Sequence, residues 1–242
     1  MKLCFSHIKG LVFALVCLLA ALPAPAQRNT FVGNRLYADS KPLHLGFSVG
    51  MHMQDLKFTH NGYTTPEGEN WYAEVPAYSP GFCVNVLADL RLHKHFNLRL
   101  SPGMYFGNKN ITFREWHSSK EERQDSKGAY VVVPLDLKIS GDRYKNARPY
   151  VTVGVMGRLD VSKKKSDYLQ FNSMDAYLTL GLGCDFYLPF FKLNPEIKFC
   201  FGLTDVLKHD RPDLVDDPAT MRMTQSLSKV KNNMIVLTFY FE

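Results

Sequence analysis

The chain has 242 residues and a formal net charge of +6, with 29 Lys and Arg against 23 Asp and Glu. This length suits one domain or two small ones, and no Gly/Ser-rich or Pro-rich linker or internal repeat divides the sequence. The modest positive charge is spread along the chain among many acidic residues, which gives little support to nucleic-acid binding. We therefore expect a single domain with no nucleic-acid partner.

The first 26 residues have the three-part layout of a secretory signal peptide. Lys2 and Lys9 form a positive head, an apolar run covers residues 10–22, and Ala24-Pro25-Ala26 supplies the small residues that signal peptidase requires. The apolar run is short for a transmembrane helix. We therefore predict export, cleavage after this segment, and one mature domain over residues 27–242.

Three cysteines follow the predicted cleavage site, at Cys83, Cys184 and Cys200. Their odd number excludes a fully paired disulfide framework, and the absence of a C-x-x-C spacing argues against a metal site. We expect them to be small apolar side chains, and the pairing of Cys83 with Cys200 stays open. A lipoprotein signal at Cys17 is the less favoured alternative, because the bulky Val16 precedes it.

Beyond residue 40, alternation of apolar and polar residues dominates, and this pattern is typical of β-strands. Eight segments alternate in this way, and no apolar face among them carries a charged residue. The segments span residues 43–53, 82–92, 96–106, 131–139, 151–159, 176–188, 193–201 and 235–241. Because the mature chain has no apolar run long enough for a transmembrane helix, a membrane-spanning form must cross the bilayer as strands.

Alternation alone leaves open whether the apolar faces point inward, as in a soluble lipocalin-type barrel, or outward into lipid. The polar faces are crowded with small residues such as Gly46, Ser48 and Gly50, which suit the interior of a narrow barrel. The links between strands alternate between short and long, as in outer-membrane proteins. The sequence therefore predicts an all-β fold, an eight-stranded antiparallel up-and-down transmembrane β-barrel with short periplasmic turns and long extracellular loops.

The links and the prolines give specific expectations about where strands end. Short links are expected at residues 93–95, 140–147 and 189–192, and long links at residues 54–80, 107–128, 161–173 and 204–231. Pro102, Pro134 and Pro195 each remove one backbone donor within a predicted strand. We therefore expect bulges or strand ends at these three positions.

Eight charged side chains fall on the predicted lumen faces. They are Asp89, Arg99, Asp136, Lys138, Arg158, Asp185, Glu196 and Lys198. At strand spacing these side chains can form a paired network that closes the barrel, since an unpaired charge in so narrow a space is costly. A structural plug is the favoured interpretation and a proton or ion pathway is the alternative, whereas a wide diffusion pore needs about 16 strands.

Several motifs resemble catalytic or metal sites without their structural context. Residues 46–50 match the G-x-S-x-G nucleophile motif, but Ser48 lies within an alternating strand rather than at a strand-to-helix turn. His93-Lys94-His95 lacks further metal ligands, and the acidic cluster at residues 210–217 lacks the glycine and spacing of a calcium loop. We therefore expect no catalytic residue, no cofactor and no bound metal.

The long link at residues 54–80 carries five aromatic residues among turn-forming residues. They are Phe58, Tyr63, Trp71, Tyr72 and Tyr78. Exposed aromatic side chains act as anchors on partner surfaces, which makes this link a candidate partner-binding loop. The alternative is that the rings form an interfacial girdle or pack over the mouth of the barrel.

The predicted strands also carry motifs that resemble those of the PorT-like outer-membrane β-barrel proteins. Residues 129–138 read AYVVVPLDLK and match that family's Y-x-x-x-P-L-x-L-K strand, and Arg148-Pro149-Tyr150 followed by Gly154 is similar to its next strand. The segments at residues 181–188, 192–197 and 202–207 are similar to its sixth and seventh strands. The resemblance covers most of the mature chain.

The resemblance implies a component of the type IX, or Por, secretion system, which exports proteins with a conserved C-terminal signal domain and is linked to gliding motility. It implies no catalytic residues, and outer-membrane lipids and other secretion-system subunits as partners. Two alternatives stay open. One is a barrel enzyme acting on lipid A or surface peptides, with Ser48, His44 or His52 at the barrel mouth. The other is a narrow channel or adhesin unrelated to secretion.

Overall fold

The computed structural model describes residues 34–35, 38–60, 71–74, 80–115, 121–162, 171–208 and 227–242. The predicted signal peptide at residues 1–26 lies outside these ranges. Within them, no helix has the length and apolar character needed to cross a membrane. A single 3₁₀ turn, η1 (Ala38–Ser40), precedes the first strand of the described chain.

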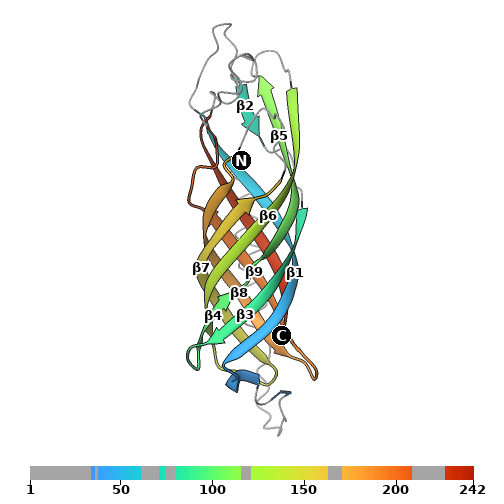
Figure 1. The fold of residues 1–242 in the computed structure, drawn as a ribbon, viewed down its shortest axis with the longest axis vertical. Helices are drawn as coiled ribbons and strands as arrows, with labels where there is room; N and C mark the ends of the chain where they lie inside the picture. Colours follow the sequence, from blue (N-terminus) through green and yellow to red (C-terminus); the bar gives the residue numbers. More distant parts are fainter. Residues whose placement is uncertain are drawn as a thin grey trace, which may run out of the picture. The chain divides into compact units, whose positions relative to one another are not determined.

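The described residues form one antiparallel sheet that closes into a barrel (Figure 1). Its strands are β1 (Leu43–His60), β2 (Trp71–Glu74), β3 (Pro80–Arg91), β4 (Phe96–Leu100), β5 (Gly103–Glu115), β6 (Glu121–Ser140), β7 (Ala147–Asp160), β8 (Met174–Tyr187), β9 (Lys192–Gly202) and β10 (Leu227–Phe241). The ring closes because β1 pairs with β10 on one side and with β3 on the other.

The wall of the ring contains eight strands, because β4 and β5 occupy one position and β2 lies outside it. β3 pairs with both β4 and β5, and so does β6, without a change of register between them. The short β2 pairs with the end of β5 at the long-loop end of the barrel (Figure 1). The predicted eight-stranded antiparallel barrel is confirmed.

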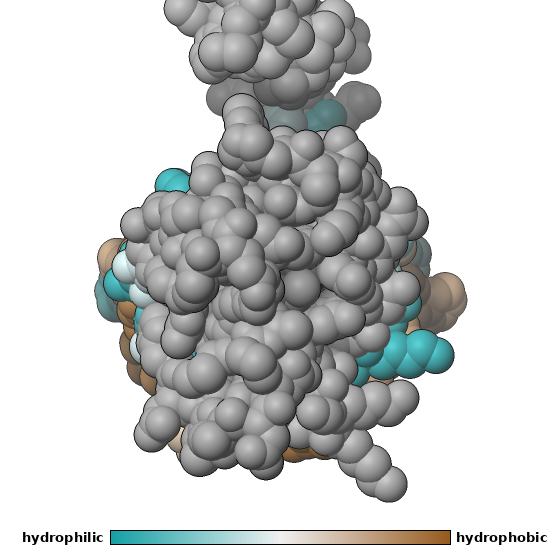
Figure 2. Space-filling view, turned by 90° about the horizontal axis from the view of Figure 1, so that it is seen from above, coloured by the Kyte–Doolittle hydropathy of each residue, from teal (hydrophilic) through white to brown (hydrophobic). Residues whose placement is uncertain are grey.

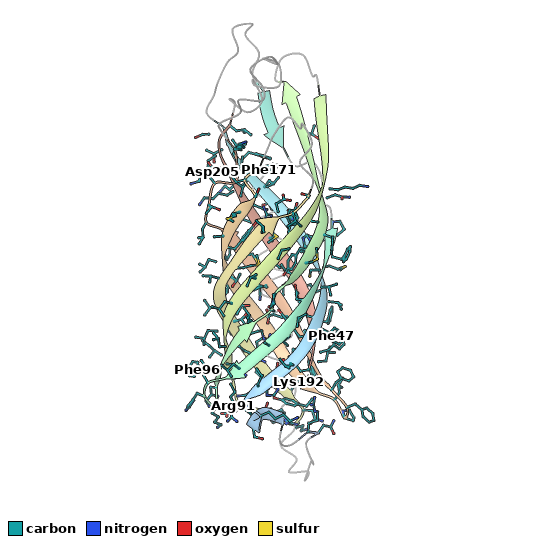
Figure 3. The ribbon with its side chains drawn as sticks, viewed as in Figure 1. Phe47, Arg91, Phe96, Phe171, Lys192 and Asp205 are labelled. Carbon is teal, nitrogen blue, oxygen red and sulfur yellow. The ribbon has the colours of Figure 1, made fainter. Side chains whose placement is uncertain are left out.

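The apolar faces of the strands point outward. Burial alternates along the strands, so that on β3 Val86 is 64% exposed while its neighbours Asn85 and Leu87 are buried, and on β1 Leu45 is 67% exposed between the half-buried His44 and Gly46. Phe47 and Phe96 project from the outer wall in Figure 3, and hydrophobic side chains are visible at the edge of the wall in Figure 2. In a soluble lipocalin-type barrel these side chains would fill the interior, so the outward orientation predicted from the small polar-face residues is confirmed.

The three prolines affect the barrel less than the sequence suggested. β6 pairs with β7 in one register through Pro134, and β9 pairs with β10 in one register through Pro195, so the bulges expected at these positions are wrong. On its other side Pro195 does interrupt the β8–β9 pairing, which stops at Gly183 and resumes at Phe186 without a change of register. Pro102 does mark a strand break, between β4 and β5. The Pro134 carbonyl accepts a hydrogen bond from the Ser101 amide, so the donor that Pro134 lacks would also face this break. Pro102 and Pro134 each lack a backbone N–H group, and both missing groups are therefore at the break between β4 and β5.

The short links are confirmed, and so is the long link at residues 161–173, which lies between the end of β7 and the start of β8. The other three predicted long links are shorter than expected. The turns after β3, β6 and β8 lie at one end of the barrel, as predicted. At the other end β1 continues to His60, and β5 and β6 pair as far as Arg114 and Glu121. Most of the loop predicted at residues 107–128 is therefore wrong. The prediction recognised strands only by the alternation of apolar and polar residues. β5 and β6 remain hydrogen-bonded to each other beyond the point where this alternation stops.

Small residues on the inner face make room for larger side chains of neighbouring strands. A Cβ atom added to Gly183 would overlap the ring of Tyr150, and one added to Gly154 would overlap the backbone and carboxylate of Asp136. An eight-stranded barrel has an interior only wide enough for side chains to fill. The glycines therefore allow large and charged side chains to share this narrow space.

The orientation of the two faces can be tested at adjacent positions in the middle of β8. Leu180 points outward, and Arg at a hydrocarbon-facing position near mid-depth is expected to lower the free energy of unfolding by about 2–4 kcal/mol. Gly181 points inward, and Gly181→Ser should act through crowding, since its Cβ would overlap Thr152 Oγ1 and lie 3.2 Å from Glu196 Oε1. Urea unfolding in lipid vesicles measures both variants. Equal tolerance of Leu180→Arg and Gly181→Ser would contradict the assignment of faces.

Candidate functional site

All eight charged residues predicted on the lumen faces are buried inside the barrel. Their exposed fractions are at most 3%. They come from β3, β4, β6, β7, β8 and β9, where the two-residue period of each strand turns them away from the outer wall. Seven of them form a connected charge network in the half of the barrel nearer the short turns, and Arg158 belongs to a separate pair.

Arg99 on β4 is the centre of this lumen charge network. Its Nη2 lies 3.1 Å from Asp89 Oδ2 on β3, and its Nη1 lies 3.0 Å from Glu196 Oε2 on β9. The guanidinium also packs 4.6 Å from the centre of the Tyr240 ring and 5.3 Å from that of Tyr150. Because β4 and β9 are on opposite sides of the ring, Arg99 connects the two walls across the lumen.

Two lysines complete the pairing of the remaining carboxylates. Lys138 Nζ lies 2.8 Å from both carboxylate oxygens of Asp185, and 4.2 Å from the centre of the Tyr150 ring. Lys198 pairs with Asp136 on β6 and lies 3.2 Å from Glu196 Oε1. Each buried cation therefore has at least one carboxylate partner, which offsets part of the cost of removing the charges from water.

The sequence analysis missed two members of the network, Lys192 and Glu242. Lys192 Nζ lies 2.6 Å from Glu242 Oε2 and 3.5 Å from Asp185 Oδ2. Figure 3 places Lys192 near the short-turn end of the barrel. Both residues lie one position beyond a predicted apolar segment, and strand alternation continued by one step would have placed each of them on the inner face.

The charges around Glu242 change its acidity. Burial alone raises the pKa of its carboxyl, but the cations around it, Lys192 first, outweigh burial and hold the pKa well below its usual range. His44 Nδ1 lies 3.5 Å from Glu242 Oε2 and contributes a hydrogen bond to the carboxylate. Glu242 is therefore ionised in the folded protein at neutral pH.

The half of the lumen nearer the long loops is mainly apolar and aromatic. Its buried cluster consists of Cys83, Tyr105, Tyr130, Val132, Met156, Tyr177, Cys200, Met234 and Val236. Arg158 lies beside this cluster, 3.6 Å from Asp175 Oδ2 and 4.6 Å from the centre of the Tyr130 ring. Cys83, Cys184 and Cys200 are all free thiols. Single apolar residues on otherwise polar faces gave no periodic signal, so the sequence analysis did not find this cluster.

The short-turn mouth of the barrel is covered by η1. Asp39 lies 3.6 Å from Arg148 Nη1 and 4.0 Å from Arg143 Nη1, and it accepts a hydrogen bond from the Tyr187 hydroxyl. The polar cavity between Asp39 and Lys138 has a volume of about 10 Å³, enough for about one water molecule. Side chains and η1 therefore fill this end of the lumen.

The residues considered for catalysis are inside the barrel. Ser48 is fully buried and accepts a hydrogen bond of 3.0 Å from Asn85 Nδ2. His52 is also buried, where it stacks on Tyr105 at 5.1 Å between ring centres. His44 lies near the short-turn mouth beside Glu242. Within the described ranges, no group of three or more His, Cys, Asp or Glu side chains is arranged to hold a metal ion.

The candidate partner-binding loop is only partly described. Phe58 lies in β1 and is partly exposed, rather than in a loop, and Trp71 and Tyr72 lie in β2. Tyr63 and Tyr78 fall outside the described residues. β2 ends the sheet order beside β5, so the described part of this link forms a short edge strand.

Comparison with known proteins gives one family match. The model of the family described as "Outer membrane protein beta-barrel domain" matches residues 26–208, a range that includes β1 through β9. No curated protein matches the sequence.

Similar solved structures include the Neisserial surface protein A, at 9% identity and a TM-score of 0.44 over 83% of this chain and 98% of that chain. Ail, the attachment invasion locus protein of Yersinia pestis, is 12% identical with a TM-score of 0.36, over 81% of this chain and 96% of its own. The translocator domain of the autotransporter NalP from Neisseria meningitidis is 10% identical with a TM-score of 0.32, over 100% and 97% of the two chains.

The importance of the lumen charge network can be tested at Arg99. Arg99→Met keeps an apolar stem but leaves Asp89 and Glu196 buried without their main partner, which is expected to destabilise the barrel by about 3–5 kcal/mol. Urea unfolding in lipid vesicles measures this change.

Lys94→Gln is the matched control for Arg99→Met. It breaks the pair of Lys94 with Asp142, at 3.1 Å, whose side chains are 66% and 78% exposed. Loss of an exposed pair should change the free energy of unfolding by at most about 1 kcal/mol. If the two variants were equally stable, the network would not hold the barrel together.

The lowered pKa of Glu242 predicts how the stability of the barrel changes with pH. Its pKa is lower in the folded state than in the unfolded state, so it contributes stability above the unfolded pKa, and this contribution is lost as the pH falls through the folded pKa. Glu242→Gln should therefore destabilise the barrel at neutral pH, and the difference from the wild type should shrink as the solution is acidified. Unfolding free energies measured across this pH range test the prediction. A difference independent of pH would contradict it.

Proposed function

This chain belongs to the outer-membrane protein β-barrel domain family, and we propose that it is a non-enzymatic component of the type IX (Por) protein secretion machinery. In an outer-membrane barrel the short turns face the periplasm and the long loops face the exterior. Export through the predicted signal peptide at residues 1–26 is part of the proposal. The protein would support export of cargo with C-terminal signal domains, and through it gliding motility.

The filled lumen is the observation that supports this role most directly. Arg99 and its partners connect opposite walls in the periplasmic half, and in the outer half a cluster of apolar and aromatic side chains is buried together with the Arg158–Asp175 pair. A polypeptide cannot pass through an eight-stranded barrel whose interior is occupied by side chains. The protein would therefore serve export through its outer wall, its loops or its periplasmic turns, as a part that binds other subunits.

The motifs that resemble PorT-like proteins coincide with the lumen network. Lys138, the last residue of the Y-x-x-x-P-L-x-L-K match in β6, bonds to Asp185, which lies in the matching segment of β8. Gly181 and Gly183 in that segment leave space for Thr152 and Tyr150. The resemblance therefore rests on residues with a definite structural role in this barrel, and this supports assignment to the PorT type.

The extracellular edge strand is the proposed contact for a partner subunit. β2 pairs with β5, and in the part of the chain that the structure describes no strand pairs with its other edge. An unpaired strand edge can accept a strand from another protein through backbone hydrogen bonds. This site would provide a link to the rest of the machinery.

A deletion strain tests the proposed function. Cargo with the C-terminal signal domain should accumulate in the periplasm, and a plasmid copy of the wild-type gene should restore its export. Immunoblots of periplasmic and culture fractions measure the distribution. Normal export in the deletion strain would refute the secretion role while leaving the barrel assignment intact.

Two further measurements separate the alternatives. Ser48→Ala should restore export as well as the wild type does, and lipid A from the deletion strain should have an unchanged mass spectrum. A mass change that Ser48→Ala fails to reverse would instead indicate a barrel enzyme. Stable single-channel currents of the purified protein in planar bilayers would indicate a narrow channel.

A further inference from the structure

Three lysines form a positive patch on the outer wall, where β1 and β10 emerge from the apolar band. Lys57 and Lys231 are directly opposite each other in the β1–β10 register, and Lys229 is the next outward residue of β10, opposite Thr59. The inward residues between them are buried, Leu56 on β1 and Val230 and Asn232 on β10. All three lysines therefore project from the same side of the wall. We call Lys57, Lys229 and Lys231 the lysine patch.

The lysine patch keeps a net positive charge among the described residues. Like charges directly opposite each other on antiparallel strands are destabilising. None of the ion pairs within the described ranges involves these lysines. Two carboxylates lie near the three lysines. Asp55 is opposite the neutral Asn233, and Asp205 accepts a hydrogen bond of 3.0 Å from the amide of Val230, between Lys229 and Lys231. An anion bound at the patch would relieve the repulsion between the lysines.

An apolar groove begins directly below the lysine patch. It has a volume of about 410 Å³ on β1, β9 and β10, with Asp55 and Asn233 at the end nearer the lysines. Met53, Phe201 and Ile235 form its exposed apolar lining, at 49%, 49% and 48% exposure. Adjacent outward residues on a strand are about 7 Å apart, so a molecule could contact the lysines and the groove together.

Among the described residues, a pair of lysines directly opposite each other on the outer wall occurs only on the β1–β10 side. Near the outer ends of β7, β8 and β9, exposed apolar residues include Val161, Met174 and Leu203, which are 48%, 75% and 55% exposed. On the β5–β6 side Lys127 is opposite Asn108, so no second lysine faces it.

We propose that the lysine patch and its groove bind a phosphorylated glycolipid of the outer leaflet. The lysine ammonium groups would contact phosphates of the headgroup, because lysine binds phosphate as a compact positive charge. One acyl chain would lie in the groove among Met53, Phe201 and Ile235. Three lysines on one face suit a headgroup with more than one phosphate, and a headgroup with a single phosphate would engage fewer of them.

Lipid retention in nanodiscs tests this site. The full mature protein is folded into phosphatidylcholine nanodiscs that contain a small fraction of either diphosphorylated lipid A or phosphatidylglycerol. Native mass spectrometry then counts the anionic lipid that stays bound to the released barrel. The wild type should retain lipid A in preference to phosphatidylglycerol. The triple variant Lys57→Gln, Lys229→Gln, Lys231→Gln should retain about tenfold less lipid A.

Matched variants distinguish the site from general charge effects. The control triple variant Lys94→Gln, Lys127→Gln, Lys145→Gln removes the same charge from exposed positions elsewhere and should retain lipid A as the wild type does. Ile235→Trp fills the groove, keeps all charges and should also reduce retention. The shift between heated and unheated samples on SDS gels verifies that each variant is folded.

Three outcomes would overturn the proposal. The first is equal loss of lipid A from the patch variant and from the control variant. The second is wild-type retention of lipid A no greater than that of the patch variant. The third is equal retention of phosphatidylglycerol and lipid A, which would mean that the lysines attract any anionic lipid.

Discussion

Closure of the hydrogen-bonded ring between β1 and β10 is the constraint on which the rest of the structure depends. Hydrocarbon offers no water to unpaired amide and carbonyl groups, so a sheet that crosses a bilayer must have no free edge there. Eight strands satisfy this requirement with a lumen that side chains must fill. The glycines of the inner face, the paired charges and the aromatic rings are consequences of that narrow space. Pro102 and Pro134 are tolerated because their missing donors fall together at one break in the wall.

The interior is divided into two halves with different chemistry. The periplasmic half contains ions that connect opposite strands, such as Arg99 with Glu196, and the outer half contains buried apolar and aromatic residues. Removing one member of a buried ion pair costs more than the pair contributes, because its partner is left charged without water. The periplasmic half is therefore intolerant of single changes. The outer half combines one buried ion pair, Arg158 with Asp175, with a closely packed apolar and aromatic cluster, in which the volume of each side chain matters.

The sequence predicted the strands, their faces and the eight lumen charges, because a strand that crosses lipid must alternate every two residues. It failed where that requirement ends. The paired ends of β5 and β6 and the short β2 lie beyond the apolar band, and their residues show no alternation. Lys192 and Glu242 were missed because each lies one step outside a predicted segment. Cys83 and Met156 were missed because a single apolar residue on a polar face produces no pattern along its own strand. Their cluster partners lie on other strands, which the sequence alone does not bring together.

The partners of Arg99 differ greatly in their distance along the chain. Asp89 is 10 residues away, whereas Glu196 is 97 and Glu242 is 143 residues away. A nascent barrel with only its first strands assembled would hold the guanidinium with a single nearby carboxylate. The other two carboxylates that pair with Arg99 are Glu196 on β9 and Glu242, the residue that follows β10. A partly assembled barrel would therefore carry the Arg99 charge into lipid without most of its carboxylate partners, which is unfavourable. We therefore expect membrane insertion and ring closure to occur as one cooperative step rather than strand by strand.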